Sequence, residues 1–405
     1  MSMAKQGAKA AVPRLRFLEF GNEPQWETSH LGDICELYQP ETIPSSSFTT
    51  DGMHLVYGAG GVIGRLDRFN HEHAEVIIGC RGVCGNASLT EPKSWITGNA
   101  MVIRSKSDKL SKPFLFHLLD AADLSPVISG SAQPQITRQG LRRFSISAPA
   151  PAEQQKIADC LTSLDEVIAA QGRKVEALKA HRRGLMQQLF PRAGETRPRL
   201  RFPEFRNAPE WEVARVRDLF DTSSGGTPDR KTKKYWGGGV PWVTTSMVNF
   251  NVITNADEFI SEAGLKSSSA KVFPKGTVVV AMYGQGKTRG QVALLGVDAA
   301  TNQACAAILP SDDIEPEFVF FSLSGRYDEL RSLSNSGGQE NLSQGLIREL
   351  PFRYPKDKNE QAAIIDCLAS VDTYITAETA RLAALKTHKQ GLMQQLFPVP
   401  EAAQA

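Results

Sequence analysis

Two long segments of the chain place apolar residues at alternating intervals of three and four. In the first, which holds no proline between 152 and 189, these positions are Ile157, Leu161, Leu164, Ile168, Val175, Leu178, Leu185 and Leu189. In the second they are Ile364, Leu368, Val371, Ile375, Leu382, Leu385, Leu392 and Leu396. This spacing collects apolar side chains on one narrow face of an α-helix, as in a coiled coil. We therefore predict long helices over 151–191 and 358–398, ended by Pro191 and Pro398.

The stretches that precede these helices show a different pattern. Short β-branched apolar runs bounded by Gly, Asn and Pro predict buried strands at 76–79, 100–103, 277–282 and 305–309. Residues 114–120 and 317–323 resemble short helices. Each stretch is therefore expected to form a mixed α/β globule, here called a body, and the predicted fold class of the chain is α+β.

The chain also repeats itself at a constant offset of 207 residues. The string G-L-M-Q-Q-L-F-P occurs at 184–191 and again at 391–398, and E-Q-Q-K-I-A-D-C-L at 153–161 resembles E-Q-A-A-I-I-D-C-L at 360–368. A second repeat does not share this offset: a lead-in, P-R-L-R-F-x-E-F, begins at Pro13 and again at Pro198. We therefore infer that the chain arose by tandem duplication. The predicted division is a tail (1–12), first body (13–150), first helix (151–191), linker and lead-in (192–209), second body (210–357), second helix (358–398) and C-terminal tail (399–405).

Four polar residues on the apolar seams indicate how the helices pair. They are Gln171 and Arg182 in the first helix and Glu378 and Lys389 at the same offset in the second. A parallel pair would oppose Arg182 and Lys389, which is unfavourable. An antiparallel pair whose facing residue numbers sum to 560 joins Arg182 to Glu378 and Gln171 to Lys389, and leaves Ile157, Leu161, Ile364 and Leu368 to pack on their own bodies. A slip of one layer, a seam shared with another subunit, and helices packed only on their own bodies are the alternatives.

Composition narrows the class of protein. Hydrophobic residues make up 41% of the 405 and charged residues 22%, which is typical of soluble globular chains with two or three domains. No run of ~18–20 apolar residues and no signal-peptide core is present, so we expect a cytoplasmic protein with no membrane contact and six reduced cysteines. Because the formal net charge is only +2, any binding of a polyanion must come from local patches.

Several motifs suggest enzyme or metal chemistry but are incomplete. Gly286-Lys287-Thr288 lacks the earlier glycine of a phosphate-binding loop, since Ala281 stands there, and a strand is expected at 291–295 instead of a helix. The glycines at 58, 60 and 61 do not complete a dinucleotide loop, and Pro228-Asp229 is not followed by the remainder of a nuclease motif. His71, His73, Cys80 and Cys84 form one metal-like cluster with C-x3-C spacing, for which buried thiols and surface histidines are the alternative.

Duplicated helices that separate two divergent globules resemble the specificity subunit of a type I DNA restriction-modification system. The resemblance covers the whole chain and depends on the duplicated G-L-M-Q-Q-L-F-P, on G-G-T-P at 225–228 with Y-W-G-G at 235–238 and V-P-W at 240–242, on V-Y-G-A-G-G-V-I-G at 56–64, and on polar stretches at 133–137 and 339–343. The first body lacks the G-G-T-P and Y-W-G-G signature.

The resemblance implies a non-catalytic DNA-recognition protein. Its two bodies would be target recognition domains, each reading half of a bipartite site in double-stranded DNA, separated by antiparallel coiled-coil helices with pseudo-two-fold symmetry that set the spacing. Two methylase subunits, and two restriction/translocase subunits when present, would assemble on it. No cofactor is expected in this chain, and S-adenosylmethionine is expected on the methylase. The chain holds no N/D-P-P-Y/F tetrapeptide of an amino-methyltransferase.

Basic and amide side chains beside aromatic rings are the candidates for DNA contact, because they bind phosphates or pair with base edges. In the second body they are Arg230, Lys231, Lys233, Lys234, Tyr235, Trp236, Tyr283, Gln285, Lys287, Arg289, Gln339 and Asn341. In the first body they are Tyr57, Arg65, Arg81, Asn86, Gln133, Gln135 and Arg138. No catalytic residue and no metal ligand is predicted. A solvated charged loop is the alternative for 229–236.

Two other functions are kept beside this one. A stand-alone DNA-binding or anti-restriction relative would bind DNA without a complete restriction complex. A nucleotide-dependent transferase would use residues 284–288, although the motif there is incomplete.

Overall fold

The computed structural model describes residues 12–130, 132–284, 286–333 and 341–398. The chain forms two compact units, Met1–Arg173 with Thr379–Ala405, and Lys174–Glu378. Each unit therefore combines one body with a segment of both long helices, α4 (Pro151–Leu189) and α10 (Lys358–Leu396). Among the described helices, none is both long and apolar enough to cross a membrane.

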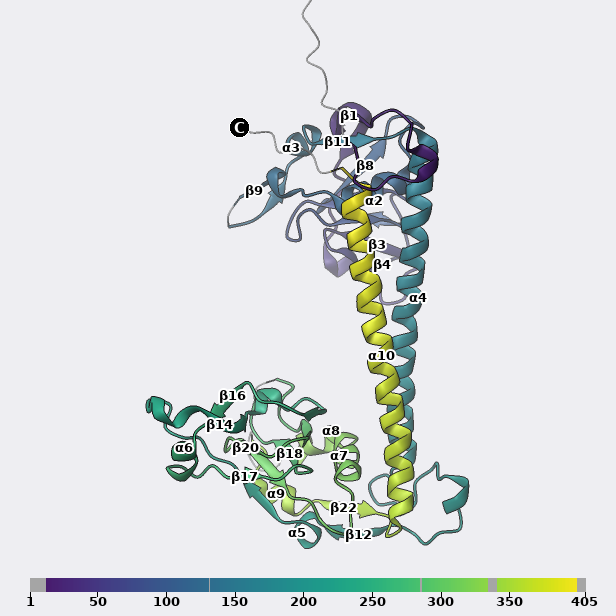
Figure 1. Ribbon diagram of the computed structural model, residues 1–405. Coiled ribbons are helices and arrows are strands. Elements are labelled where there is room, and N and C mark those ends of the chain that lie inside the picture. Colours follow the sequence, from purple (N-terminus) through teal and green to yellow (C-terminus); the bar gives the residue numbers. More distant parts are fainter. Residues whose placement is uncertain (1–11, 131, 285, 334–340, 399–405) are drawn as a thin grey trace, which may run out of the picture. The chain divides into compact units, whose positions relative to one another are not determined.

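The first body is built from small sheets that are antiparallel except for the parallel pair β3–β7, together with the helix α2 (Figure 1). Its largest sheet has the order β2-β8-β5-β6, and a second has the order β4-β3-β7. The elements are β1 (Glu27–His30), α1 (Leu31–Ile34), β2 (Cys35–Tyr38), β3 (His54–Gly58), β4 (Gly61–Leu66), β5 (Val76–Gly79), β6 (Ala87–Leu89), β7 (Trp95–Ile96), β8 (Ala100–Ser105), α2 (Lys112–Ala121), β9 (Ile128–Ser129), β10 (Gln135–Ile136), α3 (Arg138–Arg142) and β11 (Ser145–Ala148).

The second body repeats this plan with larger sheets. A five-stranded sheet has the order β13-β21-β18-β19-β15, and a four-stranded sheet has the order β16-β14-β20-β17. The elements are β12 (Glu212–Arg215), α5 (Val216–Leu219), β13 (Thr222–Ser224), β14 (Trp236–Val243), β15 (Asn251–Ile253), β16 (Glu258–Ile260), α6 (Glu262–Lys266), β17 (Val272–Phe273), β18 (Val278–Ala281), β19 (Val292–Leu295), β20 (Ala299–Thr301), β21 (Cys305–Ile308), α7 (Pro316–Ser324), α8 (Tyr327–Leu333), α9 (Gln344–Arg348) and β22 (Pro351–Tyr354). The predicted mixed bodies with long helices are confirmed.

The E-Q dipeptide that opens each duplicated segment fixes a helix to its own body. Buried Glu153 accepts hydrogen bonds from Arg16 Nε (2.8 Å) and from Trp26 Nε1 (3.3 Å). Its copy Glu360 accepts from Arg201 Nε (2.7 Å) and Trp211 Nε1 (3.0 Å). We call these two arrangements the carboxylate clamps. The adjacent Gln154 and Gln361 also hydrogen-bond to backbone groups of their own bodies.

The far end of each helix packs into the body of the other duplicate. Met393, Leu396 and Phe397 of the second copy lie in the core of the first body, with Trp26 and Phe114. Met186 and Leu189 of the first copy lie in the core of the second body. The G-L-M-Q-Q-L-F-P string is therefore repeated because it forms the same docking surface twice.

Within each unit the two helix segments run antiparallel, side by side (Figure 1). The predicted register is wrong. Arg182 binds Asp372 instead of Glu378, and Lys389 binds Asp165 (2.8 Å) instead of pairing with Gln171. In each of these pairs the two residue numbers add up to 554. The pairs are equivalent in the two duplicates, because adding the 207-residue offset to Arg182 gives Lys389 and adding it to Asp165 gives Asp372.

Glu378, another of the four polar seam residues, follows the same corrected register. The Glu378 carboxylate pairs with the Lys174 ammonium group (2.7 Å), and the two residue numbers add up to 552. The register therefore slips by about one heptad from the predicted 560. This register is possible because the long side chains of Arg182 and Lys389 reach from the seam to Asp372 and Asp165, which flank it.

Ile364 and Leu368 share a core cluster with the second body and with Met186 and Leu189 of the other helix. Ile157 and Leu161 likewise share the core of the first body with Met393 and Leu396, so these four residues belong to cores that also contain the other helix.

The corrected register predicts which cysteine pairs can be crosslinked. Leu178 and Ile375 fall opposite each other when facing numbers sum to about 553, whereas Val175 and Leu385 belong to the rejected register. We expect Leu178→Cys with Ile375→Cys to form an intramolecular disulfide under mild oxidation, detected as a mobility shift on a non-reducing gel. Val175→Cys with Leu385→Cys is the matched control, and preferential crosslinking of that control would restore the original register.

Candidate nucleic-acid interface

The loop at 229–236 of the second body presents three lysines to solvent. Lys231, Lys233 and Lys234 are exposed. Asp229 organises the loop, since its carboxylate accepts hydrogen bonds from Lys231 N (3.0 Å) and Thr232 Oγ1 (2.8 Å). These bonds lower the pKa of Asp229. The carboxylate is thus engaged within the loop, and the lysine ammonium groups face outward in a suitable position for phosphates.

Arg230 and Trp236, which were predicted to contact DNA, are engaged within the body. The guanidinium of Arg230 forms a bidentate pair with Glu258 (2.7 and 2.8 Å), which raises the pKa of Arg230. It also lies 4.0 Å from the Trp236 ring centre and 4.7 Å from that of Trp242. Trp236 Nε1 donates to the Asp229 carbonyl (3.1 Å). In this conformation these two side chains support the loop, and half-buried Tyr235 flanks it.

The glycines of the G-G-T-P and Y-W-G-G motifs allow close backbone packing. A Cβ at Gly225 would lie 1.9 Å from the Thr301 carbonyl oxygen, and one at Gly238 would lie 2.4 Å from Ser261 Cα. No larger residue fits at either position without moving the backbone. These motifs therefore define the base of the loop, and the exposed lysines between them are the part free to bind a ligand.

The other polar loops of the second body are partly described. Tyr283 and Lys287 are exposed, and Arg289 is half-buried. The loop is fastened by Tyr327, whose hydroxyl donates to the Lys287 carbonyl (2.6 Å). The expected strand follows as β19, so the context of a phosphate-binding loop is missing. Asn341 is exposed, while Gln285 and Gln339 lie outside the described residues.

Tyr57 of the first body is in the core, contrary to its prediction as a surface contact. It lies on β3, its side chain is 6% exposed, and its hydroxyl accepts a hydrogen bond from Glu91 N (3.1 Å). Burial raises the pKa of Tyr57. Arg65, on the neighbouring strand β4, is exposed and donates to the Gly52 carbonyl (3.1 Å).

Five other predicted residues of the first body are exposed, namely Arg81, Asn86, Gln133, Gln135 and Arg138. Arg81 and Gln135 are joined by an isolated β-bridge. The Cys84 thiol donates to the Pro134 carbonyl (3.0 Å), which ties the same two loops together. The structure therefore brings loops 80–86 and 133–138 to one site, although they are far apart in sequence.

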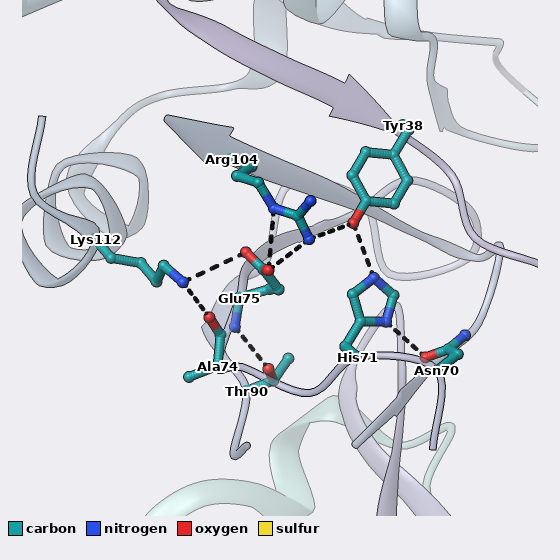
Figure 2. Close-up of polar contacts among 8 residues, drawn as sticks. All are labelled: Tyr38, Asn70, His71, Ala74, Glu75, Thr90, Arg104 and Lys112. Atoms are coloured by element: carbon teal, nitrogen blue, oxygen red, sulfur yellow. Dashed lines mark hydrogen bonds and ion pairs between the residues drawn. The ribbon is translucent and has the colours of Figure 1, made fainter. Parts of the chain in front are cut away.

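The metal-like cluster is not assembled. Cys80 Sγ contacts the Asn99 carbonyl (3.1 Å), whereas His71 Nε2 lies 2.9 Å from the Tyr38 hydroxyl and its Nδ1 lies 2.6 Å from Asn70 Oδ1 (Figure 2). Within the described residues, no group of three or more His, Cys, Asp or Glu is placed to hold a metal ion. Burial lowers the pKa of His71 and raises that of Cys80.

A polar network around His71 has no counterpart among the residues predicted from the sequence. Arg104 donates to Glu75 (2.7 Å) and to the Tyr38 hydroxyl (2.9 Å), which in turn contacts His71 (Figure 2). These residues come from different strands and loops and share no motif, so no local signal identifies them. The network braces the edge of the first body and lines an open hollow of about 510 Å³.

The chain thus holds two compact α/β bodies, each with exposed basic and amide side chains and each packed with antiparallel segments of the two long helices. The family model for the type I restriction modification DNA specificity domain matches residues 23–180 and 209–387, once for each duplicate. The chain belongs to this family. The two matches cover each body and most of the helix that follows it.

Curated relatives are specificity subunits of type I restriction enzymes. The MjaIX subunit of Methanocaldococcus jannaschii is 28% identical over 157 residues, which cover 38% of this chain and 36% of that protein. The MjaVIII subunit of the same organism is 23% identical over 75% of this chain and 74% of its own length. The EcoR124I/EcoR124II subunit of Escherichia coli is 26% identical over 47% of this chain and 49% of its own length. The chain thus spans about a third to three quarters of these relatives.

Solved structures support the fold. The specificity subunit from M. genitalium superimposes with a TM-score of 0.62 at 16% identity, covering 95% of this chain and 99% of that one. A chain from a study of complex assembly and conformational transition in a type I restriction-modification system gives a TM-score of 0.58 at 18% identity, covering 92% and 97%. The resemblance suggested by the repeated motifs is therefore confirmed.

Proposed function

We propose that this chain is the DNA-recognition subunit of a type I restriction-modification complex. Each body reads one half of a bipartite site in double-stranded DNA, and the paired helices set the spacing between the half-sites. The main support is the family match, which occurs twice and covers one body each time. The exposed cations and amides of the loops are side chains that bind phosphates and base edges.

The partners follow from the same proposal. Two methylase subunits dock on the helices and carry S-adenosylmethionine, and two restriction/translocase subunits join when cleavage occurs. This chain supplies recognition and no catalytic group. Co-expression with a methylase, followed by mapping of methylated adenines with and without this chain, tests the proposal. Adenine methylation that does not depend on this chain would contradict it.

The three exposed lysines lead to a prediction about affinity. Replacing Lys231, Lys233 and Lys234 by Ala should weaken binding about equally for cognate and unrelated DNA, because phosphate contacts carry no sequence information. The slope of log K against log salt concentration should flatten by about 0.9 for each lost contact, or roughly 2.7 in total. Titration of labelled duplexes at several salt concentrations measures it. A solvated loop with no DNA contact would leave the affinity and the slope unchanged.

Exchanging a body should change only half of the recognised sequence. Replacing residues 210–357 by the second body of another family member should alter one half of the methylated site and leave the other half intact. The reason is that each body has its own core cluster. Methylation mapping of the hybrid measures both halves at once. If both halves changed, the bodies would not be independent readers.

A stand-alone DNA-binding or anti-restriction protein is the second candidate function. It would use the same exposed loops but would not assemble with a methylase. Co-purification with a methylase separates the two functions.

A further inference from the structure

Three segments of the first body that contain no Asp or Glu meet in the structure. Residues 52–66, 76–90 and 124–152 hold five arginines and no acidic residue. The loop 80–86 lies between the other two segments, since Ile136 N donates to the Cys80 carbonyl (3.0 Å) on one side. On the other side, a Cβ at Gly79 would lie 2.3 Å from the Ala59 carbonyl oxygen. Arg65, Arg81 and Arg138 of these segments are exposed, and a region of this charge is complementary to a polyanion.

Exposed apolar side chains stand on this same surface. Val83 is 58% exposed and Val62, on the adjoining β3–β4 hairpin, is 54% exposed. Val83 reaches over the hairpin turn, where a Cβ at Gly60 would lie 3.7 Å from its Cγ2. The loop that carries Val83 also carries Arg81 and Asn86 and is bridged to Gln135. Exposed valines among side chains of these types indicate a ligand with both polar and apolar groups.

DNA offers one apolar group of this kind in the major groove. The 5-methyl group of thymine lies beside hydrogen-bonding base edges, and apolar side chains such as Ala or the Thr methyl contact it. We infer that Val83, with Val62 beside it on the hairpin, contacts thymine methyl groups in the half-site read by the first body. This inference rests on the proposed function and assigns a specificity-determining role to residues that carry no charge.

The experiment uses the complex of this chain with its methylase and a duplex holding the mapped methylation site. Each thymine of the half-site is replaced in turn by deoxyuridine, which removes only the methyl group. For the unaltered chain, at least one replacement should weaken binding about fourfold, the equivalent of one buried methyl group. Val83→Ala should bind thymine and deoxyuridine equally at that position, and Val83→Ile should keep the preference. Val213→Ala, which truncates an exposed valine of the second body, is the matched control and should also keep it.

The outcomes separate this inference from the proposed function. If the complex methylates its site but no deoxyuridine in the first half-site matters, or if Val83→Ala keeps the preference, the inference is overturned. The same holds if Val83→Ala leaves DNA binding unchanged but weakens association with a protein partner. If the complex shows no sequence-specific methylation, the proposed function fails and the inference fails with it.

Discussion

Replacing Glu360 by Gln should lower the free energy of unfolding of the second unit by about 3–5 kcal/mol, because it leaves a buried guanidinium without its counter-charge. The Glu360 side chain is 1% exposed and the Arg201 side chain 9%. The carboxylate accepts two hydrogen bonds from Arg201 and one from Trp211, so one substitution disturbs the entire carboxylate clamp. Chemical denaturation, with hydrogen exchange to assign the transition to residues 174–378, measures the effect.

The control is an exposed ion pair on the long helices. Glu176→Gln removes the partner of Lys179, in a pair whose side chains are 68% and 44% exposed, and should leave the stability nearly unchanged. Glu153→Gln, in the equivalent clamp, should destabilise the first unit instead. A cost for Glu360→Gln as small as that for Glu176→Gln would show that the clamp does not hold the helix on its body.

The duplication made much of the fold predictable. Identical strings at a fixed offset located both helices and both bodies, and the E-Q dipeptides proved to be buried contacts at equivalent places. The helix register was not predictable in the same way. The reasoning required a charged seam residue to meet another seam residue, whereas Arg182 and Lys389 are neutralised by Asp372 and Asp165, which flank the seam.

The candidate interface was predictable only where the loops are open to solvent. Lys231, in a loop, and Gln135, on the short strand β10, are both exposed, as their polar surroundings indicate. Tyr57 misled the reasoning because an aromatic residue before glycines resembles a loop residue, yet it pairs on both sides, with Val62 on β4 and with Ile96 on β7, and is buried. Arg230 has the composition of a DNA contact but stacks on two tryptophans that only the fold brings together. Contacts between residues that the fold brings together leave no local signal in the sequence, and they decide where such side chains lie.

Replacing Phe397 by Ala should destabilise the first unit by about 3–5 kcal/mol, although the residue follows the second body in the chain. Phe397 is 6% exposed, and its ring centre lies 5.7 Å from that of Phe114 and 6.4 Å from that of Trp26. Removing the ring leaves a cavity in the core of the first body. Hydrogen exchange should therefore accelerate in residues 13–173 and remain nearly unchanged in residues 174–378.

Matched variants test whether the effect belongs to this docking contact. Tyr374→Ala truncates an aromatic residue on the same helix that is 46% exposed, and should cost less than Phe397→Ala because less buried area is lost. Phe190→Ala removes the equivalent ring, which packs on Trp211 and Phe318, and should loosen residues 174–378 instead. Because Phe190 is only half-buried, its cost should be smaller than that of Phe397. If Phe397→Ala accelerated hydrogen exchange in the second unit and spared the first, Phe397 would not pack in the core of the first body, and the assignment of each helix end to the body of the other duplicate would be wrong.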